Sequence, residues 1–120
     1  MWPLSPLPPP PIPQLIKEYL GDYPDLLEKL QLALNDVVLK PVHSEPPFEV
    51  AIWALEDGLS GFFCDAQDRL RAAIATGDAA AIAQAERRES ATGYARSSGH
   101  GMKDLREIER YFEENRGALR

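Results

Sequence analysis

The chain is poor in the residues that build covalent and metal frameworks. Its 120 residues include one cysteine, Cys64, and two histidines, His43 and His100. A single thiol excludes an internal disulfide and any zinc site made from several cysteines. Neither histidine belongs to the HExxH or ExxH spacing of a helical metal site. We therefore expect no metal and no cofactor, and we interpret Cys64 as a small packing residue.

Long apolar runs and strand patterns are also absent. No uninterrupted stretch approaches the ~20 apolar residues that span a bilayer. The first basic residue is Lys17, so the charged start of a secretory signal is not indicated. No run of alternating β-branched residues predicts a strand. These absences predict a soluble cytoplasmic protein with no membrane partner.

Basic residues are missing from the middle of the chain. Residues 41–68 carry six acidic side chains and no lysine or arginine, and this segment alone equals the net charge of −6. An acidic balance argues against direct binding of nucleic acid, because the phosphate backbone would be repelled. It favours a protein partner with a basic surface, or simply solubility.

Prolines concentrate at the N-terminus, where residues 1–13 hold seven of the eleven. Because proline lacks an N–H and fixes φ, this segment is expected to be extended, as in polyproline II. Three pairs have the PxxP spacing of a recognition peptide: Pro3/Pro6, Pro6/Pro9 and Pro8/Pro11. The alternative is a flexible tail or an upstream extension of the reading frame. We assign residues 1–13 to a proline-rich extended tail and residues 14–120 to a single helical domain.

Apolar residues that recur every three or four positions predict five helices. The predicted ranges are 14–20, 23–39, 47–75, 79–96 and 102–116, with Gly21 ending the first and Asp22 capping the second. Between the third and fourth, Gly77 suits a left-handed C-cap and Asp78 an N-cap, so these helices form an antiparallel hairpin. The sequence therefore predicts an all-α protein, a small antiparallel bundle of about four to five helices around the long central hairpin 47–75/79–96.

The long third helix has an apolar stripe and a flank of small residues. The stripe of large side chains from Phe48 to Leu70 is typical of a core-facing side. Two glycines on the flank, Gly58 and Gly61, cost up to about 1 kcal/mol each relative to alanine. We expect them to allow close approach of the alanine-rich fourth helix; a kink is the alternative.

A third side of this helix is acidic and contains a tryptophan. Trp53 lies about 140° from Phe48 on the helical wheel, well off the apolar stripe. Tryptophan is enriched in binding hot spots, and carboxylates steer basic partners. The predicted partner-binding residues are Glu49, Trp53, Glu56 and Asp57. The alternative is that the protein's own N-terminal helix or proline segment covers Trp53.

No motif in the chain names a reaction, and we predict that it is not an enzyme. The leading hypothesis is a non-catalytic protein-binding module: a small acidic inhibitor, immunity or antitoxin-type protein that caps a basic partner surface. The alternative is a structural homo-oligomer, because the fourth helix is poor in large apolar residues and a second copy could cover it. A third hypothesis is a small-molecule or anion binder, or an enzyme, using the 94–101 loop with Tyr94, Arg96 and His100.

Overall fold

The computed structural model describes residues 7–41 and 44–119, which contain five α-helices and one short 3-10 helix. Their bounds are α1 Gln14–Tyr19, α2 Pro24–Leu39, α3 Pro47–Thr76, α4 Ala79–Arg96, α5 Arg106–Glu114 and η1 Arg116–Leu119. These residues contain no strand, so the predicted all-α class is confirmed. The pair Pro3/Pro6 and the loop histidine His43 lie outside the described residues.

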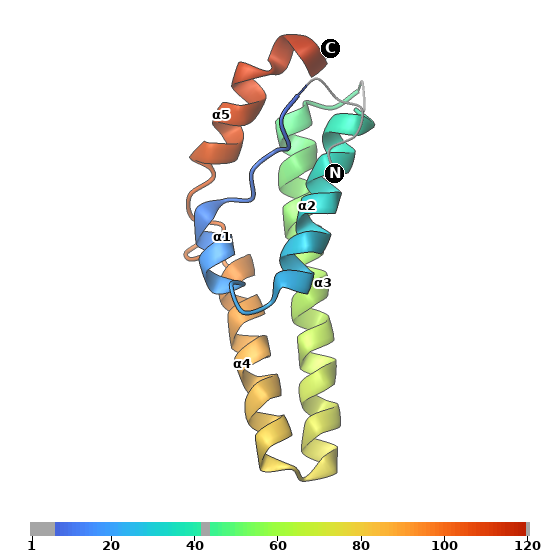
Figure 1. Cartoon of the computed structure of the whole chain (residues 1–120), viewed down its shortest axis with the longest axis vertical. Helices are drawn as coiled ribbons and strands as arrows, with labels where there is room; N and C mark the ends of the chain where they lie inside the picture. The colour runs from blue at the N-terminus through green and yellow to red at the C-terminus, as the bar shows by residue number, and fades with distance from the viewer. Residues whose placement is uncertain (1–6, 42–43, 120) are drawn as a thin grey trace.

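The hairpin of α3 and α4 is the axis of an elongated molecule that measures 55 × 29 × 24 Å (Figure 1). α2 packs beside α3, α1 packs against α4, and α5 lies near the beginning of α3. The 30-residue α3 is longer than its neighbours, so the hairpin extends beyond them and ends as two helices alone (Figure 1). None of the described helices is long and apolar enough to cross a membrane.

The turn between α3 and α4 forms as predicted. Gly77 takes the left-handed conformation with a φ of 73°, which costs glycine little because it has no Cβ. Asp78 caps α4, since its carboxylate accepts a hydrogen bond from the Ala80 N–H at 3.0 Å. Both caps could be predicted because each depends only on residues that are close in sequence.

Two predicted helix starts are wrong. Tyr23, not Asp22, is the N-cap of α2, whereas α1 has Leu20 as its C-cap and ends just before Gly21, as predicted. α5 begins at Arg106 instead of residue 102. Residues before it are used in the turn, where the Met102 N–H donates to the Ser97 carbonyl, and the Asp104 carboxylate then accepts from the Arg106 N–H.

Residues 7–13, which we call the proline segment, are extended as predicted but are not a loose tail. Leu7 and Ile12 belong to the same core as the helices. The Tyr111 hydroxyl donates to the Pro8 carbonyl at 2.6 Å, and the Gln31 amide donates to the Pro10 carbonyl at 2.8 Å. An extended proline run has no internal partners for its carbonyls, so side chains of α2 and α5 supply them. The interpretation as a flexible tail is wrong for residues 7–13.

The glycines of α3 do not receive α4. A Cβ at Gly58 would lie 3.1 Å from Leu30 Cδ2 of α2, and a Cβ at Gly61 would meet nothing within 4 Å. The close approach of α3 and α4 uses Gly93 instead, where a Cβ would lie 3.1 Å from the Phe63 ring. The helical wheel predicted the flank of small residues correctly. Which helix packs against that flank depends on the path of α2 across α3, which the wheel does not contain.

Cys64 was also placed wrongly, since its side chain is exposed on α3. The small residues of α4 are partly buried, with Thr92 and Ala95 fully covered. Thr92 satisfies its hydroxyl within the helix by donating to the Arg88 carbonyl at 2.8 Å. Hence α4 contributes little large apolar surface to the core, as its composition indicated.

Candidate functional site

The four predicted partner-binding residues, Glu49, Trp53, Glu56 and Asp57, share the outward side of α3, and we call them the acidic tryptophan face. All four are exposed, and Trp53 keeps 51% of its surface accessible. The opposite side of the same helix is fixed in the core, where Leu55 and Leu59 are fully buried. The helix therefore holds the tryptophan and the carboxylates on a rigid support.

Trp53 stands in a shallow, open depression of the surface. Its walls come from one helix: Val50, Trp53, Ala54, Glu56, Asp57 and Ser60. Val50 and Ala54 place apolar surface beside the indole, while Glu56 and Asp57 add negative charge at the edge. An indole with an apolar neighbourhood and a polar rim is the usual composition of an interface anchor.

The carboxylates of this face are unpaired within the described part of the chain. No hydrogen bond or ion pair joins Glu49, Glu56 or Asp57 to another described residue. Two aspartates further along α3 differ, because Asp65 pairs with Arg69 at 2.7 Å and Asp68 pairs with Arg71. The acidic residues of α3 therefore fall into two groups. Asp65 and Asp68 are neutralised by arginines of the same helix, whereas the carboxylates of the acidic tryptophan face remain available to a partner.

The alternative hypothesis is that the N-terminal helix or the proline segment covers Trp53, and the described residues contradict it. α1 packs against α4. The proline segment hydrogen bonds to Gln31 of α2 and Tyr111 of α5. With residues 7–13 and α1 in these places, half of the Trp53 surface remains open.

The 94–101 loop gathers three aromatic rings. Tyr94 stacks on Tyr19 with ring centroids 5.7 Å apart, and His100 meets the Tyr94 ring edge-on at 4.9 Å. The His100 Nδ1 lies 3.0 Å from the Ser97 hydroxyl. Arg96 turns away from this cluster and lies over the Phe63 ring, 5.0 Å from its centroid. The structure thus brings Tyr94 and His100 together but does not add Arg96 to them.

Neither this loop nor the rest of the described chain shows a metal centre. Within residues 7–41 and 44–119, no group of three or more His, Cys, Asp or Glu side chains is placed to hold an ion. A groove beside Tyr19 is lined by α4 as far as Ala91 and not by the loop itself. The arrangement supports packing of α1 on α4 more directly than it supports chemistry.

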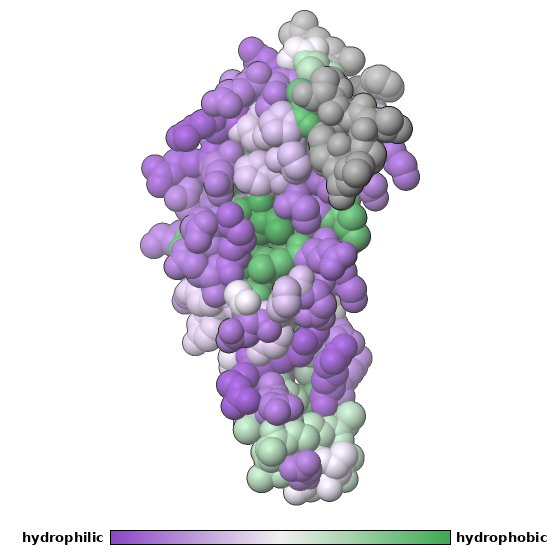
Figure 2. All heavy atoms as spheres, in the orientation of Figure 1, coloured by the Kyte–Doolittle hydropathy of each residue, from purple (hydrophilic) through white to green (hydrophobic). Residues whose placement is uncertain are grey.

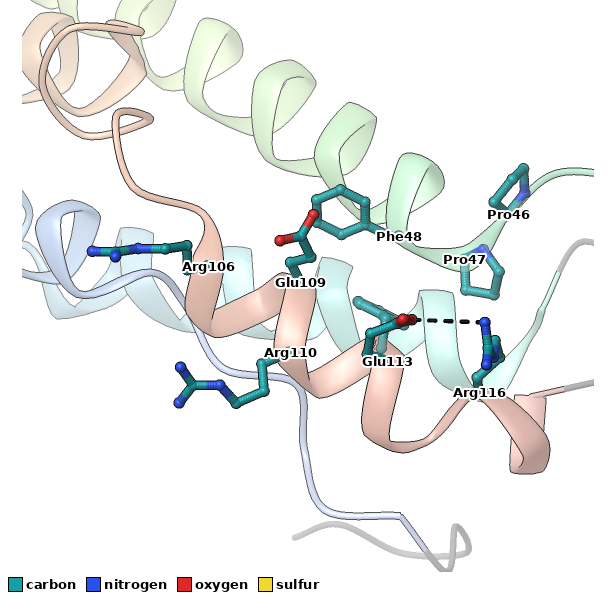
Figure 3. A pocket seen from close by; sticks show the side chains of 9 residues that line it. Pro46, Pro47, Phe48, Arg106, Glu109, Arg110, Glu113 and Arg116 are labelled. Atoms are coloured by element: carbon teal, nitrogen blue, oxygen red, sulfur yellow. Dashed lines mark ion pairs between the residues drawn. The ribbon is translucent and has the colours of Figure 1, made fainter.

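A groove that the sequence did not indicate lies between α5 and the beginning of α3 (Figure 3). It has a volume of about 720 Å³. Its floor is apolar, with the Phe48 and Phe112 rings 6.5 Å apart. Glu109 extends toward Phe48, while Glu113 pairs with Arg116 at 3.9 Å (Figure 3). One wall comes from residues 46–48 and the other from residues 106–116, so no local pattern could have revealed the groove.

In comparisons with known proteins, no protein-family model, no curated protein and no solved structure matches the chain. The functional argument therefore rests on the geometry of the chain's own surface. Its most distinctive feature is a half-exposed tryptophan among unpaired carboxylates.

Proposed function

We propose that this protein is a non-catalytic protein-binding module that caps a basic surface of a partner with its acidic tryptophan face. The observation that carries the proposal is the 51% exposure of Trp53 beside carboxylates that have no partner among the described residues. Exposed tryptophan is costly to leave in water, and its burial in an interface recovers that free energy.

The two kinds of residue would act at different stages of binding. Glu49, Glu56 and Asp57 would attract a basic surface during encounter, which raises the association rate and makes it sensitive to salt. Trp53 would then enter a pocket of the partner and slow dissociation, as buried aromatic anchors do. Because Leu55 and Leu59 fix α3 in the core, little order would be lost on binding.

Within this class we favour a small acidic inhibitor, immunity or antitoxin-type protein that acts in the cytoplasm. Such proteins need a charged, pre-formed surface and no catalytic group. The supporting observations are the net charge of −6 and the rigid helical presentation of the face. Specificity for one basic target would come from the position of Trp53 relative to the carboxylates.

The test compares two variants that each remove one exposed large apolar side chain. Trp53→Ala removes the proposed anchor, and Ile74→Ala is the matched control, because Ile74 is 57% exposed at the free end of the hairpin. Tagged wild-type and variant proteins are used to capture partners from the native extract, and the captured protein is identified and purified. Its affinity is then measured by calorimetry.

Trp53→Ala should weaken binding by about 2 kcal/mol or more, roughly thirtyfold in Kd. Ile74→Ala should bind as the wild type does. The double variant Glu56→Gln/Asp57→Asn should lower the association rate and its dependence on salt. Equal affinity of wild type and Trp53→Ala for the captured partner would exclude this face as the binding surface.

A second candidate function, a structural homo-oligomer, is supported by the exposed end of the hairpin. Residues 71–80 form this end of the hairpin, and all of them except Ala73 are exposed. A second hairpin packed there would cover Ile74 and the surrounding alanines. Light scattering over a range of concentrations tests this, and a monomer at the highest concentration would exclude it.

A further inference from the structure

A basic groove lies where the turn before α2 meets the α3–α4 hairpin. Three arginines line it, Arg69 from α3 with Arg87 and Arg88 from α4, together with Tyr23 and Gln84. Its volume is about 430 Å³, and no carboxylate is among the lining residues. In a protein with a net charge of −6, a concave site whose charged lining residues are all arginines is a local exception.

Arg88 holds a donor that nothing in the described chain satisfies. Only 15% of its side chain is accessible, and its guanidinium carbon lies 5.1 Å from the centre of the Tyr23 ring. One terminal nitrogen donates to the Asp25 carboxylate at 3.2 Å. The Nε is buried and has no hydrogen-bond partner among the described residues. A buried donor without a partner costs about 1–3 kcal/mol. Because this Nε is closed to the surface, a ligand in the groove would meet the terminal nitrogens of Arg88, and the Nε–H would report on it from one bond away.

The other two arginines also keep donors free. Arg69 donates to Asp65 through its Nε alone, at 2.7 Å, which leaves both terminal nitrogens. Arg87 has no ion pair with another described residue. Three arginines against the two aspartates that they contact, Asp25 and Asp65, leave one positive charge. Glu86 and Glu89 flank the arginine pair in sequence but do not line this groove.

We propose that this groove binds a small oxyanion, a phosphate or carboxylate group carried by a compact organic molecule. Arginine donors match the paired oxygens of both groups, and phosphate uses more of them at once. The groove is larger than a phosphate group, and Tyr23 with Ala81 and Ala85 offers apolar surface for the rest of the ligand. The site is separate from the acidic tryptophan face and independent of the function proposed for it.

The test uses inorganic phosphate and observes the arginine side chains directly by ¹⁵N NMR. Phosphate replaces chloride at constant ionic strength in the full-length protein, and acetate is titrated in a parallel arm. Phosphate should shift the Arg88 Nε–Hε signal in a saturable way. If acetate also saturates the signal but binds more weakly than phosphate, the groove is a general oxyanion site. If acetate binds more tightly than phosphate, a carboxylate is the preferred group.

Matched surface variants separate a built site from general attraction. Arg69→Gln and Arg87→Gln remove donors that line the groove, and each should weaken phosphate binding by roughly tenfold, the loss expected for one charge-assisted hydrogen bond. Arg71→Gln is the control, because Arg71 is exposed on α3, pairs with Asp68 and does not line the groove. Circular dichroism verifies that each variant keeps its helices.

Three results would overturn the proposal. The first is no saturable shift of the Arg88 signal with either anion, which would leave Arg88 as a purely structural link between α2 and α4. The second is an equal loss of affinity in Arg71→Gln, which would indicate unspecific attraction. The third is loss of phosphate binding in Trp53→Ala, since that residue belongs to the other surface and its removal should change nothing here.

Discussion

The two ends of the α3–α4 hairpin are stabilised by different interactions. At the end covered by α1, α2, α5 and the proline segment, large side chains such as Leu34, Leu55 and Leu59 are fully buried. At the free end, all but one of residues 71–80 are exposed, and none of them is fully buried. In Figure 2 the surface over the free end of the hairpin is mostly pale green, the colour of weakly hydrophobic residues.

The difference shows that one continuous helix can have two sources of stability. Burial of apolar surface contributes about 25 cal/mol per Å², so the covered end gains about 1.5–3 kcal/mol from each large side chain that it buries fully. The free end depends on helix propensity, the Gly77 and Asp78 caps, and exposed ion pairs worth a few tenths of a kcal/mol each. We expect the free end to open locally while the covered end remains folded.

The largest expected effect is a core truncation at the covered end. Leu55→Ala should lower the free energy of unfolding by about 2–5 kcal/mol, because it removes fully buried methyl groups and leaves a cavity. Ile74→Ala, at the free end, should change it by less than about 0.5 kcal/mol. Urea denaturation measures both. Similar losses in the two variants would contradict the comparison between the ends.

Two glycine substitutions should differ in sign. A Cβ at Gly101 would lie 2.0 Å from the Ala95 carbonyl oxygen, so Gly101→Ala must shift the backbone and should destabilise by about 1–3 kcal/mol. Gly61 lies inside α3 with nothing within 4 Å, and Gly61→Ala should stabilise by up to about 1 kcal/mol. Thermal unfolding of both variants measures whether each substitution raises or lowers stability. A loss of stability in Gly61→Ala would contradict the open space around Gly61.

Tyr111→Phe tests the attachment of the proline segment to α5. Removing the hydroxyl leaves the Pro8 carbonyl without this donor and should cost about 1 kcal/mol at neutral pH. Burial raises the pKa of the Tyr111 phenol above its ordinary value of 10.0. The unfolded chain therefore releases this proton first, and the stability due to Tyr111 is lost as pH rises from 10 through the folded pKa.

Unfolding curves between neutral pH and the alkaline region check both parts of this prediction. The stability difference between wild type and Tyr111→Phe should be greatest below pH 10 and should shrink above it. A difference that is constant with pH would mean that the phenol ionises alike in the folded and unfolded chains.

The smallest expected effect is loss of the α4 cap at the free end. Asp78→Ala removes the bond to the Ala80 N–H and should cost about 0.5–1 kcal/mol. Amide hydrogen exchange should quicken in residues around the turn, while amides near Leu55 stay protected. Uniform acceleration along α3 would show that the hairpin opens as one unit with the core.

The candidate site was partly predictable from the sequence. The helical wheel placed Trp53 among the acidic residues and off the apolar stripe, because residue spacing fixes the sides of a helix. It could not decide whether Trp53 is covered, since that depends on where α1 and the proline segment pack. The arginine groove was missed because Tyr23, Arg69 and Arg88 come from three distant segments.

By itself, the sequence determined the five helices, the left-handed turn at Gly77, the Asp78 cap and the composition of each side of α3. All of these depend on hydrogen bonds and side-chain spacing within a few residues. Only the tertiary structure decided that α2 packs on Gly58, that Cys64 faces outward and that the proline segment joins the core. Those outcomes depend on competition between whole surfaces for burial, and the winning neighbour of a surface is not encoded in its own local pattern.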